Sequence, residues 1–202
     1  MTFWEVMLVE TYKALEDLLW KSCALIMGPW ESVEKPALIT DPGKWIRWKH
    51  PTEGMPDWTV TDNVLFLNLS ERDEEYGRQR NSIEKTENGT VIRYAMRTRV
   101  WDMACTAYGP MSYDIIDRLK DGFFFPEVQR LMSPENVFLV PYLPRCQQVN
   151  EIFAGQWWER WDITLTFNEK YISRTDIGHI DEVTLVHNTE NHTETQVITI
   201  NR

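Results

Sequence analysis

The sequence lacks the cysteine spacing of a disulfide framework or a zinc site. Its three cysteines, Cys23, Cys105 and Cys146, are odd in number and form no Cys-x-x-Cys pair. They lie in apolar or strand-like surroundings, whereas disulfide-rich domains and structural zinc sites use paired, closely spaced cysteines. We therefore expect three reduced, buried thiols in a protein made in a cytoplasm.

Long apolar runs are also absent. No stretch reaches the roughly 18 consecutive apolar residues that suggest a membrane-spanning helix. The N-terminal stretch carries acidic residues and Lys13, with no basic leader and no small-residue cleavage site. We expect a soluble protein that has no signal peptide and no membrane partner.

Basic residues are scarce. The chain has 21 Lys and Arg against 31 Asp and Glu, which gives a formal net charge of -10. Nucleic-acid affinity depends on a field of Lys and Arg that attracts phosphate. The composition therefore argues against tight DNA binding.

Motifs of catalysis and cofactor binding are missing. There is no Gly-x-Ser-x-Gly elbow, no Gly-rich phosphate loop and no Cys/His pairing with a third orienting residue. Asp114 with Asp117 could pair for acid/base work, but charges beside a turn are usually solvated. His179, Asp181 and His187 lack a further ligand at metal-site spacing. We expect no enzyme activity, no catalytic residue, no cofactor and no metal.

Tryptophan, by contrast, is abundant, with ten residues in the chain. Trp is favoured in cores and in interfaces, where the ring buries a large area. Four lie in the Pro-rich stretch 29–58, and three of these, Trp45, Trp48 and Trp58, favour a subunit contact over sugar stacking. Glu159 and Arg160 point to opposite faces of a strand, so each is expected to meet a partner elsewhere. The candidate subunit-interface residues are Trp45, Trp48, Trp58, Trp157, Trp158, Glu159 and Arg160.

Periodicity predicts strands and helices in a mixed order. Apolar spacing predicts an amphipathic helix from Thr2 to Lys21 with Thr2 as its cap, a helix capped by Ser112 that runs to Phe123, and one from Pro126 to Met132. Alternation predicts strands over Thr90–Ala107, after an Asn88-Gly89 turn, and over Trp158–Phe167, and the first is long enough for one bent strand or a strand pair. Further strands are expected over Trp45–Lys49, the apolar run Asn63–Leu69, Asn136–Val140 and Ile177–Val186, the last of which is a strand or a strand pair. Residues 1–186 are expected to form one domain with a loop insertion at about 29–58, and 187–202 an extension that orders only against a neighbour.

The order of several segments resembles the neck-terminator or tail-terminator proteins of contractile-tailed bacteriophages. That pattern has a strand ending in aromatic-Gly, a helix, then Trp-Glu-x-Arg and a closing Ile-Asp-x-Val strand. Here Arg160 follows the Glu directly, which departs from the pattern. The segments that carry the resemblance are Ala107-Tyr108-Gly109, Tyr113 to Leu119, Pro141 to Arg145, Trp158 to Phe167 and Ile180-Asp181-Glu182-Val183.

The resemblance implies an α+β fold in which an antiparallel β-sheet is flanked by helices. It implies a structural virion protein made in the host cytoplasm, assembled as a ring, a homohexamer, at the head-proximal end of the tail. That ring would end tail-tube growth, contact tube and sheath proteins, and dock to the head connector or stopper while DNA passes through its lumen. Another head-completion or baseplate subunit, or a Trp-based carbohydrate-binding module, remains an alternative.

Overall fold

The chain divides into two compact units. The computed structural model describes residues 11–29, 37–49, 58–87, 90–153, 155–177, 182–189 and 192–199. The first unit comprises Met1–Gln79 and Arg97–Tyr171, and the second comprises Arg80–Met96 and Ile172–Arg202. Two long strands, β4 (Thr90–Tyr108) and β9 (Arg160–Ile177), contribute residues to both.

The first unit contains the helices and most of the sheet. In addition to its share of β4 and β9, its elements are α1 (Tyr12–Met27), α2 (Pro42–Trp45), β1 (Ile46–Trp48), β2 (Val64–Arg72), η2 (Glu75–Arg78), α3 (Ser112–Gly122), α4 (Pro126–Met132), η3 (Ser133–Glu135), β5 (Val137–Leu139), β6 (Gln147–Gln148), β7 (Glu151–Phe153) and β8 (Gln156–Trp158). The sheet order is β1-β2-β4-β9-β5, and β6 also pairs with β9. Strand β2 is antiparallel to β4, and β5 and β6 are antiparallel to β9, whereas β1 is parallel to β2. The expected α+β fold with a largely antiparallel sheet is confirmed.

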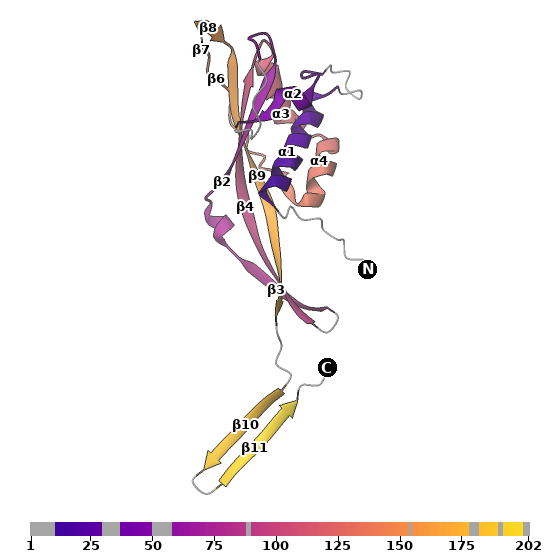
Figure 1. The fold of residues 1–202 in the computed structure, drawn as a ribbon, viewed down its shortest axis with the longest axis vertical. Coiled ribbons are helices and arrows are strands. Elements are labelled where there is room, and N and C mark those ends of the chain that lie inside the picture. The colour runs from indigo at the N-terminus through magenta and orange to yellow at the C-terminus, as the bar shows by residue number, and fades with distance from the viewer. Residues whose placement is uncertain are drawn as a thin grey trace. The chain divides into compact units, whose positions relative to one another are not determined.

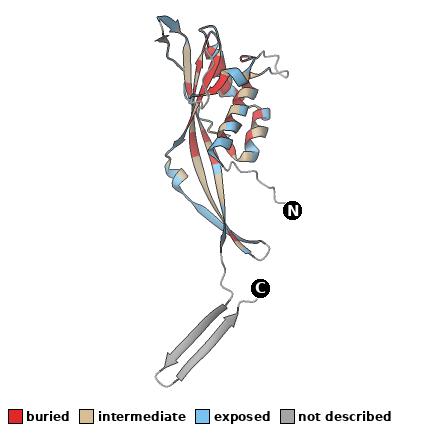
Figure 2. Cartoon of the chain, viewed as in Figure 1, coloured by how far each residue is buried: buried red, intermediate tan, exposed pale blue. Residues whose placement is uncertain are grey.

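The core lies between one face of this sheet and three helices. Figure 1 shows α1, α3 and α4 on the same side of the sheet. Side chains alternate along a strand, so every second residue points to the helices. Met103, Cys105 and Ala107 of β4 are buried, as are Leu165 and Phe167 of β9. Figure 2 shows buried segments, in red, where helices and sheet meet.

Helix α1 differs from the predicted helix at its C-terminal end. Residues 1–10, including the predicted cap Thr2, lie outside the described residues. The described helix begins at Tyr12, and the N–H of Ala14 donates to Oγ1 of Thr11, its N-cap, at 3.1 Å. The predicted end at Lys21 is wrong, because buried Cys23 and Ile26 continue the apolar stripe to Met27.

The start of α3 depends on a side chain from a distant segment. Ser112 was predicted as the cap, but it is the first helical residue and is fully buried, so that prediction is wrong. The N-cap is Met111, whose N–H donates to Oδ1 of Asn63 at 3.0 Å. Gly109 just before it has φ 107°, and a Cβ there would overlap the carbonyl oxygen of Asp62.

Most predicted strands are present with revised ends. Strands β1, β2, β4 and β5 and helix α4 confirm the predictions, while β9 continues past Phe167 to Ile177. The polar strand β3 (Asn81–Glu87) was missed; it pairs with Thr90–Met96 in the second unit. The predicted turn Asn88-Gly89 lies outside the described residues. So do residues 178–181 of the strand predicted over Ile177–Val186.

The C-terminal residues pair within the chain. Strand β10 (Glu182–Thr189) is antiparallel to β11 (His192–Thr199), with Val183 opposite Ile198. Of the extension expected at 187–202, the described residues pair within the chain, and its ordering against a neighbour stays a prediction. The register runs over the whole length of both strands, from Glu182 opposite Thr199 to Thr189 opposite His192, and every second residue pair exchanges backbone hydrogen bonds.

One buried carboxylate links β4 to β9 inside the first unit. Glu169 is 1% exposed, and it accepts from Nε and Nη2 of Arg99 at 2.9 and 2.5 Å and from Nε1 of Trp101 at 2.7 Å. The Arg99 guanidinium also stacks 4.3 Å from the ring of Tyr171. A buried charge costs free energy unless it is paired and hydrogen-bonded, and here it is both.

Replacing Arg99 tests this pairing. Arg99→Met is expected to lower the free energy of unfolding by about 3 kcal/mol, because Glu169 keeps a buried charge without its cation. The double variant Arg99→Met with Glu169→Gln should recover part of that loss, since the amide that replaces the carboxylate is neutral and still accepts from Trp101. Urea unfolding measures the free energy of unfolding of both variants.

The control is Arg72→Met, which breaks a half-exposed pair with Glu74 and should cost about 1 kcal/mol or less. Equal losses for the Arg99 and Arg72 variants would contradict the role assigned to the buried pair of Arg99 and Glu169.

Candidate protein interface at the β7–β8 hairpin

The hairpin of β7 and β8 exposes two large apolar side chains. In its register Ile152 is directly opposite Trp157, so the two side chains share one face. They are 60% and 66% exposed. Gly155 at the turn has φ 77°, a left-handed conformation that favours glycine, and a Cβ there would meet nothing within 4 Å. The hairpin therefore offers an apolar pair to solvent.

An ion cluster attaches this hairpin to the sheet. Arg160 donates to both oxygens of Asp162 at 2.9 and 2.6 Å, and its Nη1 donates to Oε2 of Glu151 on β7 at 3.1 Å. Hydrogen bonding to Asp162 is the main cause that raises the pKa of Arg160. Arg160 thus bonds to Glu151 and Asp162, and a bidentate arginine pair fixes orientation as well as distance.

Tyr108 completes the cluster from the end of β4. Its hydroxyl donates to Oε1 of Glu151 at 2.6 Å, and Arg160 lies 5.7 Å from its ring. Burial, followed by the hydrogen bond to Glu151, raises the pKa of Tyr108 to about 12. Tyr108 and Arg160 thus both bond to Glu151, and these two bonds hold the base of the hairpin.

Aromatic rings pack beside the cluster. Trp58 contacts Trp158, Tyr108 and Phe66 edge-on, with ring centroids 4.6, 4.8 and 5.7 Å apart. Such edge-to-face pairs add to area burial. Two candidate interface residues from distant parts of the sequence, Trp58 and Trp158, are thus brought together, and Trp58 also lines a small hollow of about 220 Å³.

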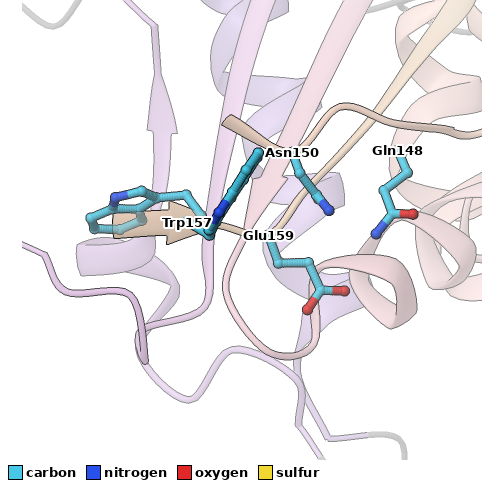
Figure 3. A pocket seen from close by; sticks show the side chains of 5 residues that line it. Gln148, Asn150, Trp157 and Glu159 are labelled. Atoms are coloured by element: carbon cyan, nitrogen blue, oxygen red, sulfur yellow. The ribbon is translucent and has the colours of Figure 1, made fainter. Parts of the chain in front are cut away.

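A larger hollow lies on the hairpin itself. It has a volume of about 500 Å³ and is lined by Gln148, Asn150, Trp157, Trp158 and Glu159. Figure 3 shows the Trp157 ring at one end and Gln148 at the other, with Asn150 and Glu159 between them in this view. Three candidate residues, Trp157, Trp158 and Glu159, therefore share one surface.

Trp45 and Trp48 lie elsewhere in the first unit. Both are partly buried against the core, on α2 and β1, and Nζ of Lys44 lies 4.0 Å above the Trp45 ring. The structure does not group them with the hairpin. Sequence reasoning missed Ile152 and Glu151. Their signal was Gly155 between two short segments that each end in two apolar residues, Glu151–Phe153 and Gln156–Trp158, an arrangement that fits a short hairpin.

Other chemistries have little support in the part of the chain that the structure describes. No group of three His, Cys, Asp or Glu residues there could hold a metal ion, and no helix there is long and apolar enough to cross a membrane. Cys23 and Cys105 are buried, as expected, and burial raises the pKa of both thiols; Cys146 is partly buried. The two buried thiols are therefore poor nucleophiles.

The Tyr108 hydroxyl gives a pH test of the cluster. Tyr108→Phe is expected to cost about 1–2 kcal/mol of unfolding free energy at neutral pH, because a hydrogen bond to a carboxylate is lost. The folded pKa, about 12, exceeds the ordinary 10.0, so this stabilisation is complete below pH 10 and is lost as pH rises to about 12. Urea unfolding against pH should show the two proteins converging over that range. Tyr142→Phe, at a residue 87% exposed, is the control and should change nothing; a gap that persists unchanged to pH 12 would refute the bond.

Comparison with known proteins places the chain in a family. A search of curated proteins finds no match. A sequence profile described as phage neck terminator protein matches residues 11–194, which is most of the chain. The matched range includes the helices, the sheet and the β7–β8 hairpin described above. The chain therefore belongs to the phage neck terminator protein family, whose members are structural proteins of the neck of the phage virion.

Proposed function

We propose that this chain forms a ring that closes the head-proximal end of the phage tail. In this role the ring ends growth of the tail tube and joins the tail to the connector or stopper of the head. The observation that carries the proposal is an anchored hairpin with two exposed apolar side chains in a member of the neck terminator family. The protein then acts by contact, without chemistry of its own.

The ring is expected to contain six copies joined by heterologous contacts. A closed ring of identical chains requires each chain to present two different patches. The hairpin with Ile152 and Trp157 is suited to be one, because exposed Trp residues are enriched among those that dominate binding. The Trp-rich stretch 29–58, with Trp45, Trp48 and Trp58, and the extension 187–202 are the candidates for the other.

DNA is expected to pass through the ring without specific binding. Several described arginines of the sheet are already paired with carboxylates, among them Arg72 with Glu74 and Asp102, Arg99 with Glu169, and Arg160 with Glu151 and Asp162. A paired guanidinium has little charge left to hold a phosphate, and the net charge of -10 adds repulsion. The proposed partners are therefore proteins: further copies, the tail-tube protein, the sheath protein and the head connector.

Assembly with the tail tube tests the ring. We expect light scattering and negative-stain images of the purified protein, mixed with the tail-tube protein of its phage, to show rings of about six copies on tube ends. Trp157→Ala should weaken this assembly without unfolding the protein, because Trp157 is exposed at 66%.

The matched control is Ile83→Ala, which removes a half-exposed apolar side chain from β3. It should leave assembly unchanged. A protein that forms no ring and does not bind tube ends would overturn the proposed function. Equal effects of the two substitutions would overturn the part assigned to the hairpin.

A further inference from the structure

The hollow on the hairpin combines aromatic rings with an acidic side chain. Trp157 and Trp158 contribute indoles, Glu159 a carboxylate, and Gln148 and Asn150 amides. This set is more specific than an apolar patch, since each group favours a particular kind of ligand atom. The chemistry of the set therefore indicates which partner would occupy the hollow.

Glu159 has negative charge that the described residues do not balance. Its side chain is exposed, and no ion pair or hydrogen bond of its carboxylate is recorded among the described residues. Neighbouring Arg160 is used by Glu151 and Asp162. Three carboxylates, those of Glu151, Glu159 and Asp162, stand against two cations, Arg160 and the Lys49 that lines the neighbouring hollow with it. The remaining negative charge attracts a positively charged ligand.

The indoles favour a cation as well. The face of a Trp ring carries the negative part of its quadrupole and attracts Lys and, more often, Arg. Trp157 is 66% exposed, and the anchored base of the hairpin presents it in a defined position. The side-chain oxygen of Gln148 adds an acceptor, while Oδ1 of Asn150 already accepts from the N–H of Arg160 at 3.3 Å.

We infer that this hollow is a recognition site for an arginine side chain presented by another protein of the neck. The planar guanidinium stacks on an indole and donates to the Glu159 carboxylate at the same time, a combination for which arginine is better shaped than lysine. The volume of about 500 Å³ exceeds one side chain and leaves room for the segment that presents it. The inference rests on the proposed function only for where the partner comes from.

A neutral sugar is the competing occupant, because Trp, Gln and Asn also line carbohydrate sites. A sugar would stack on the indoles but would leave Glu159 without a counter-charge. The unbalanced carboxylate therefore favours the cation, and charge dependence separates the two.

The experiment uses the full chain and two acetylated peptides of the sequence Gly-Arg-Gly-Arg-Gly, one of them with citrulline in place of arginine. Citrulline keeps the planar shape and removes the charge. NMR follows the indole N–H signals of Trp157 and Trp158, assigned by Trp→Phe variants. The arginine peptide should shift these signals and bind about fivefold or more tightly than the citrulline peptide. Raising the ionic strength should weaken it.

Glu159→Gln should weaken the arginine peptide to the level of the citrulline peptide. The matched control Glu71→Gln removes the charge of another exposed glutamate and should leave binding unchanged. Equal binding of the two peptides, no effect of Glu159→Gln, or shifts of the same indoles by cellohexaose instead would overturn the inference. Binding is measured without assembly, so this failure is distinct from failure to form rings on tube ends.

Discussion

The buried carboxylate of Glu169 is the constraint on which the first unit depends. It accepts three hydrogen bonds from Arg99 and Trp101, which links β9 to β4 where both strands face the core. A strand shifted by one residue turns every side chain to the other face. Such a shift of β9 would take Glu169 away from Arg99, whose largely buried cation would then have lost its partner. The pairing therefore favours one register, and the core of helices and sheet follows from it.

From that register the two ends of β9 take different roles. Toward Glu169 its side chains pack under α1, α3 and α4, with Phe167 against Phe123. At the other end Arg160 attaches the hairpin through Glu151 and Asp162. One strand thus connects the packed core to an exposed contact surface, so a stable core gives that surface a fixed position.

The sequence predicts the elements that carry strong periodicity. Helix α4 follows from Pro126 at its first turn, β4 and β9 follow from alternation, and β2 follows from its apolar run. The start of α3 could not be predicted, because the side chain that holds it is Asn63, far away in the chain. Strand β3 could not be recognised either, since Asn81–Glu87 is almost entirely exposed and polar. Its pairing with β4, not its own pattern, makes it a strand.

The candidate interface residues likewise differ in how far the fold buries them. From residue type alone, every candidate tryptophan was equally suited to a subunit interface, because the burial of each ring depends on its neighbours in the folded chain. Trp45 and Trp48 pack against the core, Trp58 lies among other rings, and Trp157 is exposed. The hairpin that carries Trp157 is ordered before any partner arrives, so little conformational entropy is lost when a partner binds. Because Arg160 is already bonded within the chain, charge selectivity at this surface falls to Glu159, the acidic group left to face a partner among the described residues of the hollow.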